Sequence, residues 1–299
     1  MVSQTCSRRK QVKRKLLAGM LGLFLTIRLL PAFSIFWAER ISLPLLNILS
    51  GIGKRFPFAL LEWAVGAACV LLLISLLRRR LLRTLFGLGT AVLLIYLVAW
   101  YPLYFLPQPV YASTPQEISR LCEALIDGLN AYEDEFPVPD DLPAKFIRFP
   151  EWMDALRISG LCSFPTGEAL VSPSLEPVSQ PFVAVHEAMH LRGVAGEGAA
   201  NIAAWEECIR RGGAYTRSAQ LWALRYGMGV LRRDAAALYE ANLLRMRHLT
   251  LQHYREAGGA YTPVPPPAFL RSLYATLGIE TAMQDYEILA PRLAAEYAG

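Results

Sequence analysis

Two histidines flank a glutamate in the short stretch Val185-His186-Glu187-Ala188-Met189-His190. Helical positions that are four apart lie on one face, so both imidazoles can reach the same ion. The HExxH spacing is typical of zinc peptidases, in which the glutamate acts as general base toward a water activated by zinc. The string predicts a Zn²⁺ site with His186 and His190 as ligands and Glu187 as the catalytic base.

The neighbouring residues predict the helix that such a site needs. Ser179 is a suitable N-cap, Pro181 fits the first helical turn, and the apolar run 182–185 supplies a buried face. Gly193 is well placed to end the helix and reverse the chain. A second helix is expected over about residues 196–211.

A catalytic zinc site usually takes three protein ligands and leaves a fourth position to water. Glu197, at the start of the second helix, is the predicted third ligand. Asn201 follows one turn later, and its side-chain oxygen is expected to accept a hydrogen bond from a ligand imidazole. Glu206 and Glu207 are alternative third ligands, although a carboxylate pair near a helix end is more often solvated.

The segment Glu197-Gly-Ala-Ala-Asn201 resembles the ExxA(D/N) element of gluzincin-type metallopeptidases. In those families the glutamate of this element is the third zinc ligand. The related metzincin pattern also begins with HExxHxxG, but its next ligand position is occupied here by Gly196, which has no side chain to bind metal. The gluzincin interpretation is therefore favoured over the metzincin one.

A longer match runs from Phe164-Pro-Thr-Gly-Glu-Ala169 through the HExxH helix to Asn201. This string resembles an uncharacterised bacterial membrane family of unknown function, DUF3810. The resemblance implies membrane helices followed by a metallopeptidase-like domain, and it places Asp285-Tyr286 at the position of a Ser-Tyr pair. Ala199 departs from the pattern, because such sequences often carry a second glutamate there.

A zinc peptidase normally stabilises the developing oxyanion with a Tyr, His or Arg across the cleft. Tyr286 is a candidate through the family resemblance, and His253 and His248 are candidates by residue type. Both histidines lie among several arginines, a setting that is typical of a solvated helix face.

Hydrophobic residues make up 54% of the 299-residue chain and are concentrated before residue 107. Three apolar stretches, 16–38, 57–77 and 84–106, each reach the length of about 20 residues that crosses a bilayer. The chain is thus expected to hold a membrane domain over 1–107 and a second domain over 108–299.

Basic residues cluster at 8–15 and at 78–83, which predicts that both segments are cytoplasmic. The expected protein is therefore a multi-pass cell-membrane protein with a cytoplasmic N-terminus and an extracytoplasmic C-terminal domain. Trp100, Tyr101 and Tyr104 fit an aromatic belt at the membrane interface. The net charge of +5 comes from these basic clusters, so nucleic acid is not an expected partner.

The second domain is expected to be α+β and mostly helical, with a zincin-like fold. Residues 167–176 are predicted to form an edge strand that could pair with a peptide, since Pro173 is tolerated only at an edge. The other expected elements are a helix over 116–132, a loop over 133–143, helices over 214–258, a proline-rich loop over 262–267 and a helix over 268–298.

These features predict a membrane-anchored zinc-dependent metallopeptidase, with the lipid bilayer and a peptide or protein substrate as its partners. Two alternatives remain open at this point. The fold could serve as a non-hydrolytic membrane sensor or peptide-binding scaffold, or the metal could simply hold two helices together.

Overall fold

The computed structural model describes residues 2–108, 110–262, 267–279, 283 and 286–297 of the chain. Most of these residues are helical, as expected. The expected loop at 262–267 falls largely outside the described residues, and so does Asp285.

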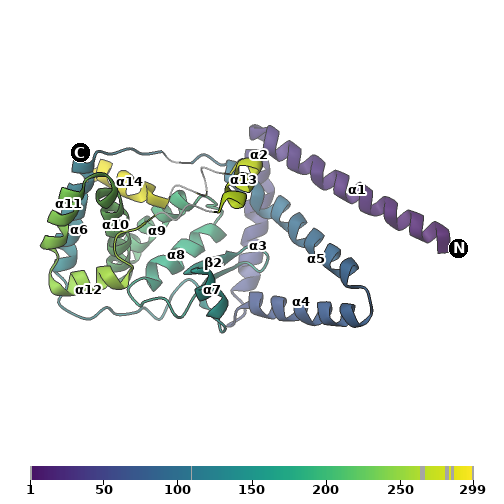
Figure 1. The fold of residues 1–299 in the computed structure, drawn as a ribbon, viewed down its shortest axis with the longest axis horizontal. Helices are drawn as coiled ribbons and strands as arrows, with labels where there is room; N and C mark the ends of the chain where they lie inside the picture. The colour runs from purple at the N-terminus through teal and green to yellow at the C-terminus, as the bar shows by residue number, and fades with distance from the viewer. Residues whose placement is uncertain (1, 109, 263–266, 280–282, 284–285, 298–299) are drawn as a thin grey trace.

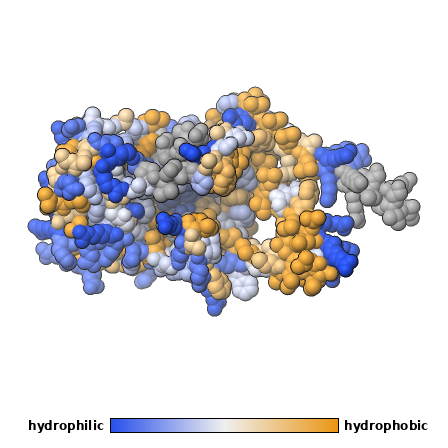
Figure 2. Space-filling view, in the orientation of Figure 1, coloured by the Kyte–Doolittle hydropathy of each residue, from blue (hydrophilic) through white to orange (hydrophobic). Residues whose placement is uncertain are grey.

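The N-terminal part is built from apolar helices that extend away from the rest of the molecule (Figure 1). Its elements are α1 (Val2–Leu29), α2 (Pro31–Trp37), the π-helical segment η1 (Ala38–Ser42), α3 (Leu43–Gly53), α4 (Leu60–Leu77), α5 (Leu81–Ile95), the π-helical η2 (Tyr96–Trp100) and the 3₁₀ segment η3 (Tyr101–Phe105). Among the described residues, three stretches are long and apolar enough to span a membrane: Pro31–Gly53, Leu60–Leu77 and Leu81–Phe105. Figure 2 shows apolar side chains over the α4–α5 hairpin.

The second and third of these stretches lie close to the predicted 57–77 and 84–106. The prediction of one helix over 16–38 is wrong, because α1 ends at Leu29 and a new helix begins at Pro31. Leu30 leaves helical geometry there, with φ −120° and ψ 86°. A residue that precedes proline is sterically driven out of the α region, so Pro31 accounts for the break.

The C-terminal part packs helices around a small sheet. Its elements are α6 (Pro115–Asn130), β1 (Lys145–Phe146), α7 (Glu151–Leu156), β2 (Gly160–Ser163), β3 (Glu168–Val171), α8 (Gln180–Leu191), α9 (Glu197–Arg211), α10 (Gly213–Asp234), α11 (Ala236–Arg245), α12 (His248–Glu256), α13 (Ala268–Leu277), η5 (Tyr286–Ile288) and α14 (Leu289–Tyr297). The expected helical structure over 268–298 is found in the described residues as α13, η5 and α14, and α13 ends before Gly278, whose φ of +71° takes the chain out of helical geometry.

The strand order is β1-β3-β2, with β1 parallel and β2 antiparallel to β3. The expectation of an edge strand at 167–176 is therefore wrong, because β3 is the central strand. Pro173 does not conflict with this position, since β3 ends at Val171. In the described part of the chain, β2 is the edge strand that lies beside α8.

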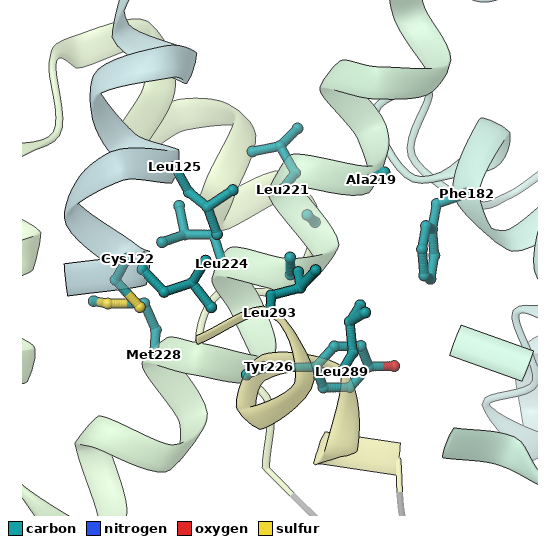
Figure 3. Close-up of a cluster of buried hydrophobic side chains, with 14 of the residues drawn as sticks. Cys122, Leu125, Phe182, Ala219, Leu221, Leu224, Tyr226, Met228, Leu289 and Leu293 are labelled. Carbon is teal, nitrogen blue, oxygen red and sulfur yellow. The ribbon is translucent and has the colours of Figure 1, made fainter. Parts of the chain in front are cut away.

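The core of the C-terminal part surrounds α10, which packs against α6, α8, α9 and α14. Figure 3 shows Leu125 of α6, Leu221 and Leu224 of α10, Leu293 of α14 and Phe182 of α8 in this core. All five are buried, and each contributes about 1.5–3 kcal/mol relative to an exposed position. The core thereby fixes α8 and α9, which carry the predicted metal ligands.

The two parts are joined by buried polar contacts. Glu168 accepts hydrogen bonds from the backbone N–H groups of Leu60 (2.8 Å) and Leu61 (3.0 Å), so it caps the start of α4. Lys145 donates to the same carboxylate at 2.7 Å and also donates to the carbonyls of Gly53 and Phe58. The loop between α3 and α4 therefore lies on the same side as the C-terminal part, while the loop between α4 and α5 lies at the opposite end (Figure 1).

Candidate metal centre

The three predicted ligands converge at the start of α9. His186 Nε2 lies 3.1 Å from His190 Nε2 and 3.2 Å from Glu197 Oε2, and His190 Nε2 lies 3.5 Å from the same oxygen. Among the described residues, these three side chains form a group that could hold a metal ion. The HExxH helix and the glycine turn after it bring them together as the sequence predicts.

The spacing of the three atoms matches a tetrahedral ion. Zinc binds imidazole nitrogen and carboxylate oxygen at about 2.0–2.1 Å, so neighbouring ligand atoms of a tetrahedral site lie about 3.3–3.4 Å apart. The three observed separations, 3.1, 3.2 and 3.5 Å, are centred on this value. The residues present therefore fit a zinc ion with two nitrogen ligands and one oxygen ligand.

A backbone carbonyl orients one of the two imidazoles. His190 Nδ1 hydrogen-bonds the Val194 carbonyl at 2.6 Å, which leaves Nε2 free to face Glu197. Gly193 makes this contact possible, because its φ of +94° turns the chain back over the end of α8. His186 Nδ1 is buried and has no hydrogen-bond partner in the described part of the chain.

Asn201 does not have the predicted role toward an imidazole. Its side-chain amide donates to Tyr226 Oη at 3.2 Å and to the Tyr286 carbonyl at 2.9 Å. The prediction fails because this face of α9 packs against α10 and η5. Asn201 instead fixes the position of Tyr286 beside the site. The group that orients His190 is the Val194 carbonyl, which the sequence did not predict.

His190 and Glu197 stabilise each other's charged forms when no metal ion is bound. Burial lowers the pKa of His190, but hydrogen bonding and the negative charge of Glu197 outweigh it and raise the pKa to about 9. Burial raises the pKa of Glu197, but hydrogen bonds from His186 and His190 bring it well below its usual value. The carboxylate thus faces the histidines as an anion, as a metal ligand must.

Glu187 lies beside the ligands but points to β2. It is buried, and a methyl group on Gly160 would lie 2.7 Å from its Cγ and Oε1 atoms. Burial raises the pKa of Glu187, while His186, His190 and the backbone N–H of Cys162 oppose the shift. A buried carboxyl with a raised pKa suits a group that takes and returns a proton.

The two alternative ligands lie elsewhere. Glu206 is exposed on α9. Glu207 accepts hydrogen bonds from Arg210 at 2.6 and 2.9 Å and from Arg211 at 3.0 Å. Both alternatives are therefore excluded as third ligands by their positions in the structure.

Of the three oxyanion candidates, Tyr286 alone lines the cavity at the site. Burial raises the pKa of its phenol, with the charge of Glu197 adding to the shift, so the phenol remains a neutral donor. His253 instead packs against Phe136 and contacts Arg217 at 3.2 Å, and His248 is exposed at the start of α12. The two histidine candidates are wrong because α12 lies at the far end of the C-terminal part (Figure 1).

A cavity of about 560 Å³ adjoins the ligands and has a largely aromatic lining. Its aromatic side chains are Tyr96, Trp100, Tyr104, Phe164, Phe182, Trp222, Tyr226, Tyr261 and Tyr286. Trp100 and Tyr101 are buried in the protein and Tyr104 is partly buried, so these side chains contact protein at the helix end. They pack inward because η2 and η3 lie against α2, α3 and the C-terminal part.

Fold and site together define a mostly helical protein with apolar N-terminal helices and a candidate three-residue metal centre. A family described as "Protein of unknown function (DUF3810)" matches residues 113–263, about half of the chain, and the chain belongs to this family. The matched region includes α8, α9 and all three candidate ligands. No curated protein and no solved structure matches the chain.

Proposed function

We propose that this chain is a membrane-anchored zinc-dependent peptidase with a gluzincin-like site in a zincin-like domain. The observation that carries the proposal is the triangle of His186 Nε2, His190 Nε2 and Glu197 Oε2, whose sides of 3.1–3.5 Å suit one tetrahedral ion. A second carboxylate, Glu187, lies beside this triangle without being part of it. A purely structural metal site would not need that fourth residue.

Each group has a separate role in the proposed hydrolysis. When bound, zinc supplies Lewis-acid activation of a water and of the scissile carbonyl. Glu187 takes a proton from the attacking water and returns it to the leaving amine. Tyr286 is placed to donate a hydrogen bond to the developing oxyanion.

The outer edge of β2 is the surface that suits the substrate backbone. Gly160, Leu161 and Cys162 of this strand line the cavity next to Glu187. An extended peptide that pairs with this edge would present its carbonyls toward the metal centre. The substrate-binding edge is thus assigned to β2, in place of the segment 167–176.

The proposed orientation keeps the C-terminal domain outside the cytoplasm. Arg78, Arg79, Arg80 and Arg83 lie at the turn between α4 and α5, at the end of the hairpin far from the metal centre. Short basic loops favour the cytoplasmic side. The metal centre then faces the extracytoplasmic surface.

The test uses the full chain purified in detergent, with zinc measured by elemental analysis. Wild type is expected to hold about one zinc per chain and Glu197→Ala to hold almost none. Glu207→Ala is the matched control, since Glu207 lies on the same helix and bonds only arginines among its described partners. Zinc retained by Glu197→Ala, or lost only in Glu207→Ala, would overturn the ligand assignment.

Hydrolysis is tested with Glu187→Gln. This variant is expected to keep its zinc while cleavage of a peptide library falls by about 10²–10⁴-fold, the usual contribution of a general base. Full cleavage by Glu187→Gln would refute the mechanism. Zinc and peptide binding without cleavage in the wild type would favour the alternative of a non-hydrolytic sensor or scaffold.

A further inference from the structure

One wall of the metal-site cavity belongs to an apolar helix that is long enough to span a membrane. Tyr96, Trp100 and Tyr104 line the cavity, and all three lie in the stretch Leu81–Phe105. The Trp100 ring meets the His190 ring edge-on with centroids 6.1 Å apart, and it stacks on Phe164 at 5.5 Å. A candidate zinc ligand therefore rests directly on a residue of the membrane segment.

The position of Trp100 along this helix places the site near the bilayer boundary. Elements α5 and η2 hold 15 and 5 residues and run from Leu81, just after the arginine turn, to Trp100. A helix needs about 20 residues to cross the hydrocarbon core. By this length Trp100 lies where the helix leaves the bilayer.

The loop between α8 and α9, which joins His190 to Glu197, also packs against the N-terminal helices. Ala195 shares a buried cluster with Ala38, Leu46 and Leu103, and Gly193 lies so close to Leu43 that a Cβ there would be 1.9 Å from its Cδ2 atom. The turn after α8 is therefore packed directly against the N-terminal helices at these residues.

The helix beneath this loop exposes apolar side chains on its other face. Phe36, Ile48 and Ile52 are 56%, 61% and 44% exposed on the stretch Pro31–Gly53. Figure 2 shows that apolar surface continues from this region over the α4–α5 hairpin. A surface of this kind is suited to contact with lipid, so the metal centre lies directly above the lipid-facing part of the molecule.

We propose that the substrate is a polypeptide held by its own membrane anchor and cut close to the bilayer surface. The inference rests on the proposed peptidase function and names its substrate class. An extended chain advances about 3.3–3.6 Å per residue, so about two to six residues beyond an anchor suffice to reach the ligands. Anchoring also raises the effective substrate concentration to about the millimolar range. The aromatic cavity suits the apolar residues that flank a membrane anchor.

The experiment reconstitutes the full chain in lipid vesicles together with a reporter that is released on cleavage. The reporter joins a single transmembrane helix to a randomised segment of about ten residues, through a spacer of about zero, five or twenty residues. The same randomised segment without any anchor is the free-peptide arm. Glu187→Gln is the control for background release in every arm.

Cleavage is expected to be at least about 10-fold faster with the shorter spacers than with the long spacer or without an anchor, because the anchor confines the cleavable segment to the membrane surface beside the site. As a readout independent of turnover, Glu187→Gln is expected to bind the short-spacer reporter at least about 10-fold more tightly than the free peptide. Equal cleavage and equal binding in all arms would overturn the inference and leave the peptidase proposal standing. No zinc-dependent release in any arm would overturn the peptidase proposal itself, and the inference with it.

Discussion

The sharpest test of the proposed base is the replacement of Gly160, the first residue of β2, by alanine. The φ angle of Gly160 is not left-handed, so its backbone conformation is open to alanine. Space is the constraint, because a Cβ at this position would lie 2.7 Å from Glu187 Cγ, Glu187 Oε1 and Val183 Cγ1. Glycine here permits the close approach of β2 to α8.

The expected effect follows from the displacement that the methyl group forces. Ordinary contacts of a Cβ begin at about 3.4 Å, so the contacts at 2.7 Å must open by about 0.7 Å. Val183 is buried on α8 and has little room to retreat, so the Glu187 side chain or β2 must move. Misplacing a catalytic group by about 1 Å can cost about 10²-fold, and we expect Gly160→Ala to lower kcat by about 10–100-fold.

Zinc content separates this effect from a general loss of the site. The three atoms nearest to the added methyl group belong to Glu187 and Val183 and not to the candidate ligands, so Gly160→Ala is expected to keep its zinc. Gly128→Ala on α6 is the matched control, since its new Cβ would meet Gln220 Nε2 at an ordinary contact distance of 3.5 Å. That control is expected to retain activity and gain up to about 1 kcal/mol of stability.

The assay measures kcat with a cleavable reporter, zinc content and the thermal unfolding temperature for both variants. Wild-type kcat in a folded, zinc-loaded Gly160→Ala would refute the placement of Glu187 as a base held against β2. Loss of zinc in Gly160→Ala would also contradict the prediction, because the substitution would then disturb the metal ligands as well as Glu187.

Three further substitutions test the contacts around the centre. Gly193→Ala should destabilise the chain by about 2–5 kcal/mol, from left-handed strain and the clash with Leu43, and a wild-type unfolding temperature would contradict this. Glu168→Gln should lower the free energy of unfolding by about 3 kcal/mol, because Lys145 loses its buried counter-charge. Adding Lys145→Met to this variant should recover part of the lost thermal stability. Hydrogen bonds from Arg210 and Arg211 outweigh the effect of burial and lower the pKa of Glu207 from 4.5 to about 2. The contribution of ionised Glu207 to the free energy of unfolding is therefore present above pH 4.5 and is lost as the pH falls toward 2. At neutral pH the wild type should be more stable to unfolding than Glu207→Gln by about 1 kcal/mol, a small difference because the arginines are partly exposed. This difference in stability should vanish in acid, and a difference that stays constant across that pH range would refute the ion pairing of Glu207.

The ligand set could be predicted from the sequence because it depends on local geometry. His186 and His190 share a helix face through their spacing alone, and a glycine turn after the helix leaves few positions for the start of the next one. Glu197 follows from these two constraints. The same holds for the helix bounds, since α8 begins after Ser179 and ends before Gly193 and α9 ends at Arg211, although the Ser179 side chain makes no capping hydrogen bond.

The failed predictions concern contacts between distant segments. Asn201 lies one turn from Glu197, as expected, but its partner depends on how α9 packs against α10 and η5. His253 is a reasonable candidate by residue type, yet the path of α12 carries it away from the site. β2 has only four residues and pairs on one side, so its sequence holds no alternation from which an edge strand could be predicted.

Trp100 shows most clearly why hydropathy and tertiary structure lead to different conclusions. Its position in the sequence predicts the end of an apolar helix, and Trp100 does lie near the end of such a stretch. The same residue also lines the cavity beside the candidate ligands. A division of the chain near residue 107 would separate Trp100 from His190 and Leu103 from Ala195, which are packed together. The orientation of the ligand loop therefore depends on both parts of the chain. Any activity of the candidate metal centre should then respond to displacement of this apolar helix, because Trp100 contacts the His190 imidazole directly.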